Sequence, residues 1–175
     1  KRENKGMTGA PLRLMIVGIP NVGKSSFINR MAKSKKAKVE DRPGVTRTKQ
    51  WVKLGDNVEM LDMPGVLWPK FEDQEAARKL AFTGAVKDDI LDVEALASLL
   101  LEYLYKRYPE ALKDRYKIEN GSEGFELLCQ AGRNRGMLIS GGEVTTERAA
   151  ITVLDEFRSG KLGRITLELP EEEQK

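Results

Sequence analysis

The stretch GIPNVGKS at residues 18–25 decides the fold. It matches the pattern GxxxxGK[ST], follows a short apolar run from Leu12 to Val17, and precedes a helical pattern from Ser25 to Ala32. A strand, a glycine-rich turn and a helix in this order are the context in which the pattern forms a phosphate-binding loop. Glycines let backbone N–H groups point at phosphate oxygens, and the helix N-terminus adds partial positive charge. We therefore predict that residues 18–25 bind the phosphates of a nucleotide.

The side chains of this loop have separate predicted roles. Lys24 is expected to contact the β- and γ-phosphates, and the Ser25 hydroxyl is expected to ligate Mg²⁺. The other predicted nucleotide-binding positions are Asn21, Val22, Gly23 and Ser26. A glycine-rich turn without a ligand is the alternative, and it fits less well because all four fixed positions of the pattern are present.

A second motif, Asp62-Met63-Pro64-Gly65, follows an apolar strand pattern from Val58 to Leu61. Nucleotide hydrolases with a phosphate-binding loop need an acidic residue on an adjacent strand to hold Mg²⁺. Asp62 is therefore a predicted metal ligand, and the Gly65 amide is expected to meet the γ-phosphate. A surface turn is the alternative for an isolated motif of this kind.

A loop between the two motifs, DRPGVTRT at residues 41–48, contains the remaining candidate ligand. A threonine in such a loop can bind Mg²⁺ while the γ-phosphate is present and release it after hydrolysis. Thr46 is the preferred candidate, with Thr48 as a close competitor and an ordinary Pro-Gly turn as the alternative. The predicted catalytic set is therefore Lys24, Thr46 and Gly65.

Four segments taken together, GIPNVGKS, DRPGVT, DMPG and VLWPKFED, resemble the circularly permuted GTPases that assist assembly of the large ribosomal subunit. The resemblance covers about Leu12 to Pro170. It implies GTP and Mg²⁺ as ligands, with Lys24, Ser25, Thr46 and Asp62 in the phosphate and magnesium roles. It also implies a C-terminal helical domain that binds ribosomal RNA, which the charge pattern does not independently support.

Position 66 departs from a common GTPase pattern. Many GTPases place a glutamine after the glycine of the second motif to orient the attacking water, whereas this chain has Val66. A valine cannot hydrogen-bond water, so intrinsic hydrolysis is expected to be slow without a partner. In several proteins with this replacement, the loop asparagine helps to bind K⁺, and Asn21 is the corresponding hypothesis here.

The expected fold class is α/β: a partial, permuted GTPase domain at residues 1–90, a helical domain at 91–170, and a disordered tail at 171–175. An apolar stripe at i, i+3, i+4 and i+7 predicts a helix from Val93 that ends near Pro109. Further helices are expected over 122–135 and 146–159, and a terminal strand over 164–169. No NKxD motif for guanine follows Gly65, which leaves two explanations: the rest of the sheet lies upstream of residue 1, as in the permuted family, or this is a different and smaller P-loop protein. We expect the first, because a helical domain begins directly after the magnesium-binding region. The isolated chain is then expected to bind guanine nucleotides weakly and with little base selectivity.

The composition excludes several classes of protein. The chain has no histidine and one cysteine among 175 residues, so it can form neither a histidine-based catalytic triad nor an internal disulfide. Residues 1–90 contain 18 Lys and Arg against 11 Asp and Glu, and residues 91–175 contain 12 against 16. No apolar run is long enough to span a bilayer, and a cytosolic monomer is expected.

The leading interpretation is a GTP-hydrolysing switch whose partner is the large ribosomal subunit and its RNA. A non-enzymatic RNA-binding module and a P-loop ATPase are the competing interpretations. Arg133 and Arg135, near the end of the second C-terminal helix, are candidate RNA phosphate contacts, although solvated arginines at a helix end explain them as well.

Overall fold

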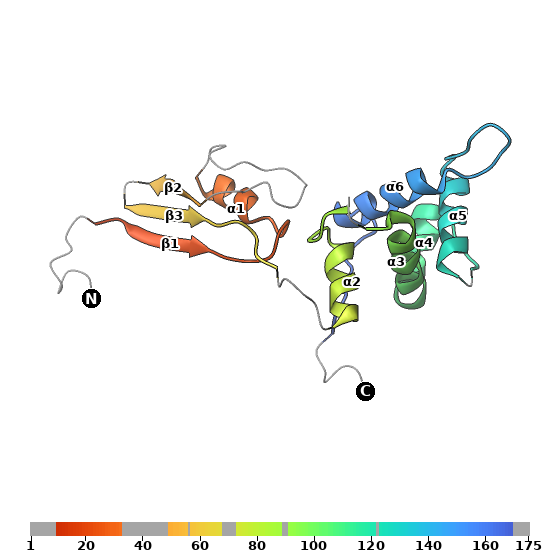
Figure 1. The fold of residues 1–175 in the computed structure, drawn as a ribbon, viewed down its shortest axis with the longest axis horizontal. Coiled ribbons are helices and arrows are strands. Elements are labelled where there is room, and N and C mark those ends of the chain that lie inside the picture. The colour runs from red at the N-terminus through yellow and green to blue at the C-terminus, as the bar shows by residue number, and fades with distance from the viewer. Residues whose placement is uncertain are drawn as a thin grey trace. The chain divides into compact units, whose positions relative to one another are not determined.

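The computed structural model describes residues 10–32, 49–55, 57–67, 73–88, 91–121 and 123–169. Its elements form two compact units (Figure 1). The first unit contains residues 1–71 and 84–86, and the second contains residues 72–83 and 87–175. The predicted switch threonines at positions 46 and 48 lie outside the described residues.

In the part of the chain that the structure describes, the first unit is a three-stranded sheet with one helix. Strand β1 (Leu12–Ile16) pairs in parallel with β3 (Val58–Asp62), and β3 pairs antiparallel with β2 (Gln50–Gly55), which gives the order β1-β3-β2. Helix α1 (Lys24–Met31) packs on the sheet through a small core of Ile28, Val52 and Met60. The predicted strands and the predicted helix are therefore confirmed to within two residues at each end. Because β1 and β3 are parallel, their carboxyl ends meet at one edge of the sheet.

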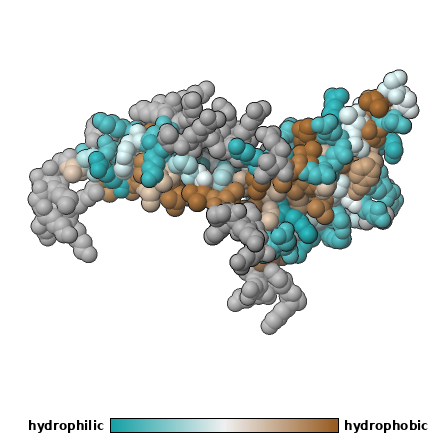
Figure 2. Space-filling model, in the orientation of Figure 1, coloured by the Kyte–Doolittle hydropathy of each residue, from teal (hydrophilic) through white to brown (hydrophobic). Residues whose placement is uncertain are grey.

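The burial of the first strand differs from the prediction. A continuous apolar run is typical of a strand covered on both faces, but Met15 is 61% exposed and Val17 is 66% exposed. Strand β1 lies at the edge of the described sheet, where it pairs with β3 alone. Figure 2 shows the hydrophobic surface that results along this part of the sheet unit. The burial on both faces that such a run indicates is therefore not found among the described residues.

The described residues of the second unit form a bundle of five helices: α2 (Gln74–Phe82), α3 (Val93–Arg107), α4 (Pro109–Tyr116), α5 (Gly124–Asn134) and α6 (Thr146–Arg158). Helix α3 packs against each of the other four. Its predicted stripe is confirmed, because Leu100, Leu101 and Leu104 are fully buried in the core. Among the described residues, no helix combines the length and the apolar character that crossing a membrane requires.

Three features of the helical unit differ from the sequence-based expectations. The expected strand over 164–169 is absent, because the carbonyl oxygens of Thr166 and Leu167 accept hydrogen bonds from the Tyr103 hydroxyl rather than from another strand. Pro109 begins α4 instead of merely ending α3, since proline is well tolerated in the first turn of a helix. Helix α2 was not predicted at all.

Helix α2 also makes the division of the chain differ from the expected boundary at residue 90. It belongs to the helical unit, where Ala81 and Phe82 are buried in the core. The Arg158 guanidinium of α6 donates to the carbonyl oxygens of both residues, at 3.0 Å in each case. The same guanidinium forms an ion pair with Asp88 at 2.6 Å. Burial and these bonds attach α2 to the helices that follow it.

A buried carboxylate joins three helices of this unit. The Glu156 side chain in α6 is 5% exposed and pairs with Arg115 of α4 and with Arg135, the residue that follows α5, at 3.0 Å. It also accepts a hydrogen bond from the Tyr116 hydroxyl at 3.0 Å. The hydrogen bonds from Arg115 lower the pKa of Glu156 below its ordinary value of 4.5, against the opposing effect of burial. Burial, together with the adjacent carboxylate, raises the pKa of Tyr116.

This network predicts a pH-dependent contribution to stability. Replacing Glu156 with glutamine removes the negative partner of two arginines and should lower the free energy of unfolding near neutral pH by about 2–4 kcal/mol. Because folding lowers the pKa of Glu156, the wild-type advantage is present above 4.5 and is lost as the pH falls through the lower pKa of the folded state. Urea denaturation, monitored by circular dichroism, measures the free energy of unfolding of the wild type and the variant near neutral pH and again below the pKa of Glu156.

The control for this prediction is Glu147→Gln, an exposed carboxylate on the same helix. It should change stability by no more than about 0.5 kcal/mol at either pH. A difference between wild type and Glu156→Gln that stays constant from neutral pH to below the pKa of Glu156 would contradict the assigned role of the carboxylate.

Candidate nucleotide and magnesium site

The loop between β1 and α1 has the backbone conformation of a phosphate-binding turn. Asn21 and Gly23 both adopt positive φ angles, of 58° and 86°. Successive residues that alternate in this way direct their N–H groups into one concave space that suits an anion. Gly23 is also the N-cap of α1 and provides no side-chain hydrogen bond to the helix. The first-turn N–H groups of α1 therefore remain suited to an anionic ligand.

Lys24 is held over this loop. Its side chain is mostly buried, with 9% of the residue exposed, and its Nζ donates to the carbonyl oxygens of Gly18 at 3.1 Å and Ile19 at 2.6 Å. Burial lowers the pKa of Lys24, and the nearby Asp62 carboxylate opposes that shift. A phosphate beside Nζ would stabilise the ammonium form. The structure thus places a desolvated cation at the edge of the space that the loop encloses.

Ser25 and Asp62, the two predicted magnesium ligands, are in direct contact. The Ser25 hydroxyl donates to Oδ2 of Asp62 at 2.9 Å, although the two residues are 37 positions apart in the sequence. Asp62 is fully buried, and its Oδ1 has no hydrogen-bond partner among the described residues. An unpaired carboxylate oxygen is costly to bury, and a cation would offset that cost. These oxygens fit Mg²⁺, which protein sites often hold through one or two carboxylates while water molecules complete the shell.

Gly65 lies directly against the phosphate-binding loop. A Cβ atom at this position would be 2.5 Å from the Cα and the backbone nitrogen of Pro20, closer than real Cβ contacts allow. The next residue, Val66, donates its backbone N–H to the carbonyl oxygen of Gly18 at 3.3 Å. Glycine at position 65 therefore allows the segment after β3 to approach the loop, which is the position a γ-phosphate sensor requires.

The remaining predicted site residues differ in their exposure and in what their side chains contact. The side chains of Val22 and Ser26 are exposed. Their predicted contacts with a nucleotide would therefore be made by backbone atoms, or by side chains that contact nothing until the nucleotide is bound. The Asn21 side chain donates to the carbonyl oxygen of Gly84 at 2.8 Å, a contact that no sequence pattern indicates. Among the described residues, no group of three or more His, Cys, Asp or Glu forms a metal cluster. A magnesium ion here would therefore depend on Ser25 and Asp62, with the predicted Thr46 outside the described residues.

These features define a P-loop nucleotide-binding protein: a strand, a loop with two positive φ angles, a buried lysine, and a serine in contact with the aspartate of the adjacent strand. The model of the 50S ribosome-binding GTPase family matches residues 13–117. The chain belongs to this family.

Individual relatives agree with that assignment. The chain is 50% identical over 173 residues to a protein of Bacillus cereus named ribosome biogenesis GTPase A, a match that covers 98% of this chain and 58% of the relative. A protein of the same name from Thermotoga maritima is 35% identical, with 91% and 57% of the two chains covered. The chain thus spans a little over half the length of these relatives.

Solved structures give a similar result. The GDP-bound structure of TM YlqF matches with a TM-score of 0.59 at 29% identity and covers 97% of this chain and 65% of that one. The structure of GNP-bound YlqF from T. maritima matches with a TM-score of 0.58 at 31% identity, with 91% and 60% covered.

The contact between Ser25 and Asp62 predicts a magnesium-specific defect. Asp62→Asn keeps the size of the side chain but removes the charge, so it should reduce the gain in nucleotide affinity that Mg²⁺ provides by about tenfold or more, roughly 1.4 kcal/mol. Titration of a fluorescent guanine nucleotide with and without excess chelator measures this gain.

The matched control is Glu59→Gln, three residues earlier on β3. The Glu59 side chain lies on the opposite face of the sheet from Asp62 and forms an ion pair with Arg13 at 3.2 Å. Its replacement should therefore leave the magnesium effect unchanged. An Asp62→Asn variant that gains as much affinity from Mg²⁺ as the wild type would contradict the assignment of Asp62 as a ligand.

Proposed function

We propose that this chain supplies the phosphate and magnesium site of a GTP-hydrolysing switch that assists assembly of the large ribosomal subunit. The observation that supports this proposal most directly is the 2.9 Å contact between Ser25 and Asp62, beside the buried Lys24 and the unpaired Oδ1 of Asp62. Serine and aspartate oxygens at the mouth of a phosphate-binding loop are the arrangement that P-loop NTPases use to hold Mg²⁺.

Each residue has a defined task in this proposal. Lys24 and the first-turn N–H groups of α1 neutralise and orient the β- and γ-phosphates. Ser25 and Asp62 hold Mg²⁺, which when bound neutralises charge on the phosphate oxygens during phosphoryl transfer. Gly65 keeps the segment after β3 against the loop at Pro20, so a γ-phosphate in the loop affects the position of that segment. Thr46 is proposed as the ligand that leaves after hydrolysis.

The relatives named above support the ribosomal part of the proposal. Their names refer to ribosome biogenesis, and the family model is described by binding to the 50S ribosome. We propose that the helical unit contacts ribosomal RNA, and that the protein works in the cytoplasm, where bacterial ribosomes assemble. Of the two candidate phosphate contacts, Arg135 is engaged with Glu156, whereas Arg133 is exposed at the end of α5. Arg133 is therefore the better candidate.

Stimulation by ribosomal subunits is the direct test of this function. Phosphate release from GTP by the 175-residue chain should rise by at least about tenfold with purified large subunits and remain near its basal rate with small subunits. Lys24→Ala should abolish the stimulated rate, because it removes the cation that contacts the β- and γ-phosphates. Equal stimulation by both subunits, or none by either, would contradict the proposal. Base preference is a poor readout here, because no NKxD motif follows Gly65.

Potassium dependence forms a separate prediction. Val66 is exposed and cannot hydrogen-bond the attacking water, so fast hydrolysis needs another contribution, such as positive charge near the transferred phosphate. We propose that Asn21 helps to hold K⁺ there, and hydrolysis with large subunits should be at least about tenfold faster in potassium than in sodium. Asn21→Ala should remove the difference, whereas Val22→Ala, which keeps the backbone amide, should preserve it. Equal rates in the two salts with the wild-type chain would refute the idea.

A further inference from the structure

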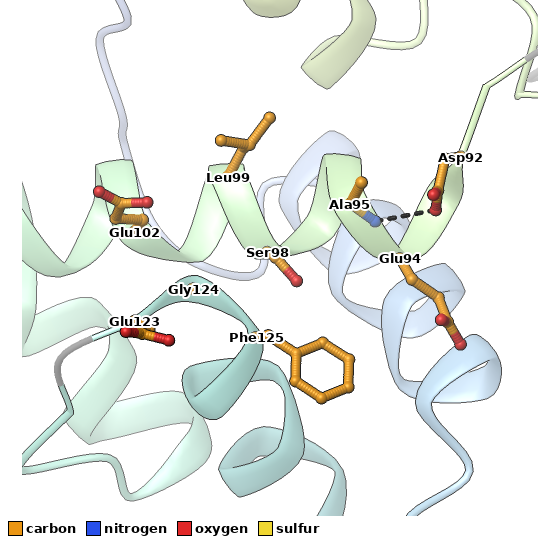
Figure 3. Close-up of a pocket in the computed structure, with 9 residues that line it drawn as sticks. All are labelled: Asp92, Glu94, Ala95, Ser98, Leu99, Glu102, Glu123, Gly124 and Phe125. Atoms are coloured by element: carbon orange, nitrogen blue, oxygen red, sulfur yellow. Dashed lines mark hydrogen bonds between the residues drawn. The ribbon is translucent and has the colours of Figure 1, made fainter.

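A groove in the helical unit shares no residue with the nucleotide site. It lies between the first part of α3 and the start of α5 and has a volume of about 640 Å³ (Figure 3). Four of its lining residues are acidic, namely Asp92, Glu94, Glu102 and Glu123, and among the described residues no lysine or arginine lines it. The groove is therefore an acidic site within a chain whose net charge is +3.

Most of this negative charge is not neutralised. Of the four carboxylates, only Glu102 forms an ion pair among the described residues, with Lys106 at 2.6 Å. Asp92 accepts a hydrogen bond from the Ala95 amide at the start of α3, and Glu94 accepts one from the Thr146 hydroxyl. Glu123 precedes α5 and makes no capping hydrogen bond. The hydrogen bonds fix the positions of two carboxylates and leave their charge in place.

An aromatic side chain stands in the same groove. The Phe125 ring is turned toward the space between the two helices, and the residue is 55% exposed (Figure 3). The Ser98 hydroxyl points toward the same space, with its oxygen buried and without a hydrogen-bond partner among the described residues. A large exposed apolar side chain costs free energy in water, and a bound partner that covers the Phe125 ring would remove that cost.

The groove is preformed because α3 and α5 approach closely at its floor. A Cβ atom at Gly124 would lie 2.3 Å from the Ser98 carbonyl oxygen, so the helices are in contact there. Seven of the nine lining residues therefore lie on two packed helices, and the other two, Asp92 and Glu123, are the N-cap residues of those helices. A rigid surface loses little conformational entropy when it binds a partner.

We propose that this groove binds a basic segment of another protein, in which lysine or arginine side chains flank one apolar side chain. The apolar side chain would pack on Phe125, and the cations would face Asp92, Glu94 and Glu123. Charge complementarity identifies the partner as a basic polypeptide, because unpaired carboxylates repel the phosphates of RNA. The proposal does not depend on the nucleotide site, so Lys24→Ala should leave this binding unchanged.

A probe peptide tests the proposal on the whole 175-residue chain. The fluorescein-labelled peptide KKLKKAKKL should bind in an anisotropy titration and shift the amide NMR signals of residues 92–102 and 123–125. The acidic peptide EELEEAEEL should not bind, and an oligouridylate of about 12 nucleotides should not displace the basic peptide. No binding of the basic peptide up to about 1 mM, shifts confined to other residues, or displacement by the RNA would overturn the proposal.

Matched variants test whether peptide binding depends on the groove or only on the general acidity of the surface. Glu94→Gln/Glu123→Gln should weaken peptide binding by about fivefold or more, whereas Glu110→Gln/Glu119→Gln, the same change at exposed positions outside the groove, should alter it by less than about twofold. Phe125→Ala should weaken binding by about fivefold, and Ile151→Ala, at an exposed apolar residue of α6, should not. Equal losses in the groove variants and their controls would refute the assignment.

Discussion

The contact between the Ser25 hydroxyl and the Asp62 carboxylate is the interaction on which the nucleotide site depends. It joins the start of α1 to the end of β3, and the parallel pairing of β1 with β3 makes it possible by setting Ile16 beside Asp62. Ile28, about one turn further along α1, also holds the helix on the sheet through its contacts with Val52 and Met60. The loop is thereby fixed at both ends, which positions Lys24 and leaves room for Gly65 against Pro20.

The sequence predicted those elements whose local pattern and tertiary packing agree. The stripe of α3 and the strand, loop and helix around Gly18 are of this kind. Prediction from the sequence failed where one pattern is compatible with two structures. Pro109 both ends α3 and begins α4. The apolar run of β1 indicates burial that the described sheet does not provide. Apolar and polar residues alternate over 164–169 as in a strand, yet the carbonyl oxygens of this segment accept hydrogen bonds from the hydroxyls of Tyr103 and Tyr108.

Much of the candidate site followed from spacing, because the phosphate-binding loop and the acidic motif have fixed positions relative to strands. The approach of Ser25 to Asp62 is of this kind. The contact of Asn21 with Gly84 and the cluster around Glu156 could not be predicted, since they join residues 63 and 41 positions apart with no repeating pattern. Arg135 illustrates the same limit: an arginine near a helix end suggested RNA, and the fold places it on Glu156.

Ser25 and Asp62 are proposed to hold a divalent cation beside a bound triphosphate. A crystal structure of the protein with Mn²⁺ and a non-hydrolysable GTP analogue, solved with anomalous data, tests it most directly. We expect a manganese peak about 2.2 Å from the Ser25 hydroxyl oxygen, with Asp62 bound directly or through one water molecule. A metal located elsewhere, with the hydrogen bond between Ser25 and Asp62 still intact beside the bound nucleotide, would contradict it.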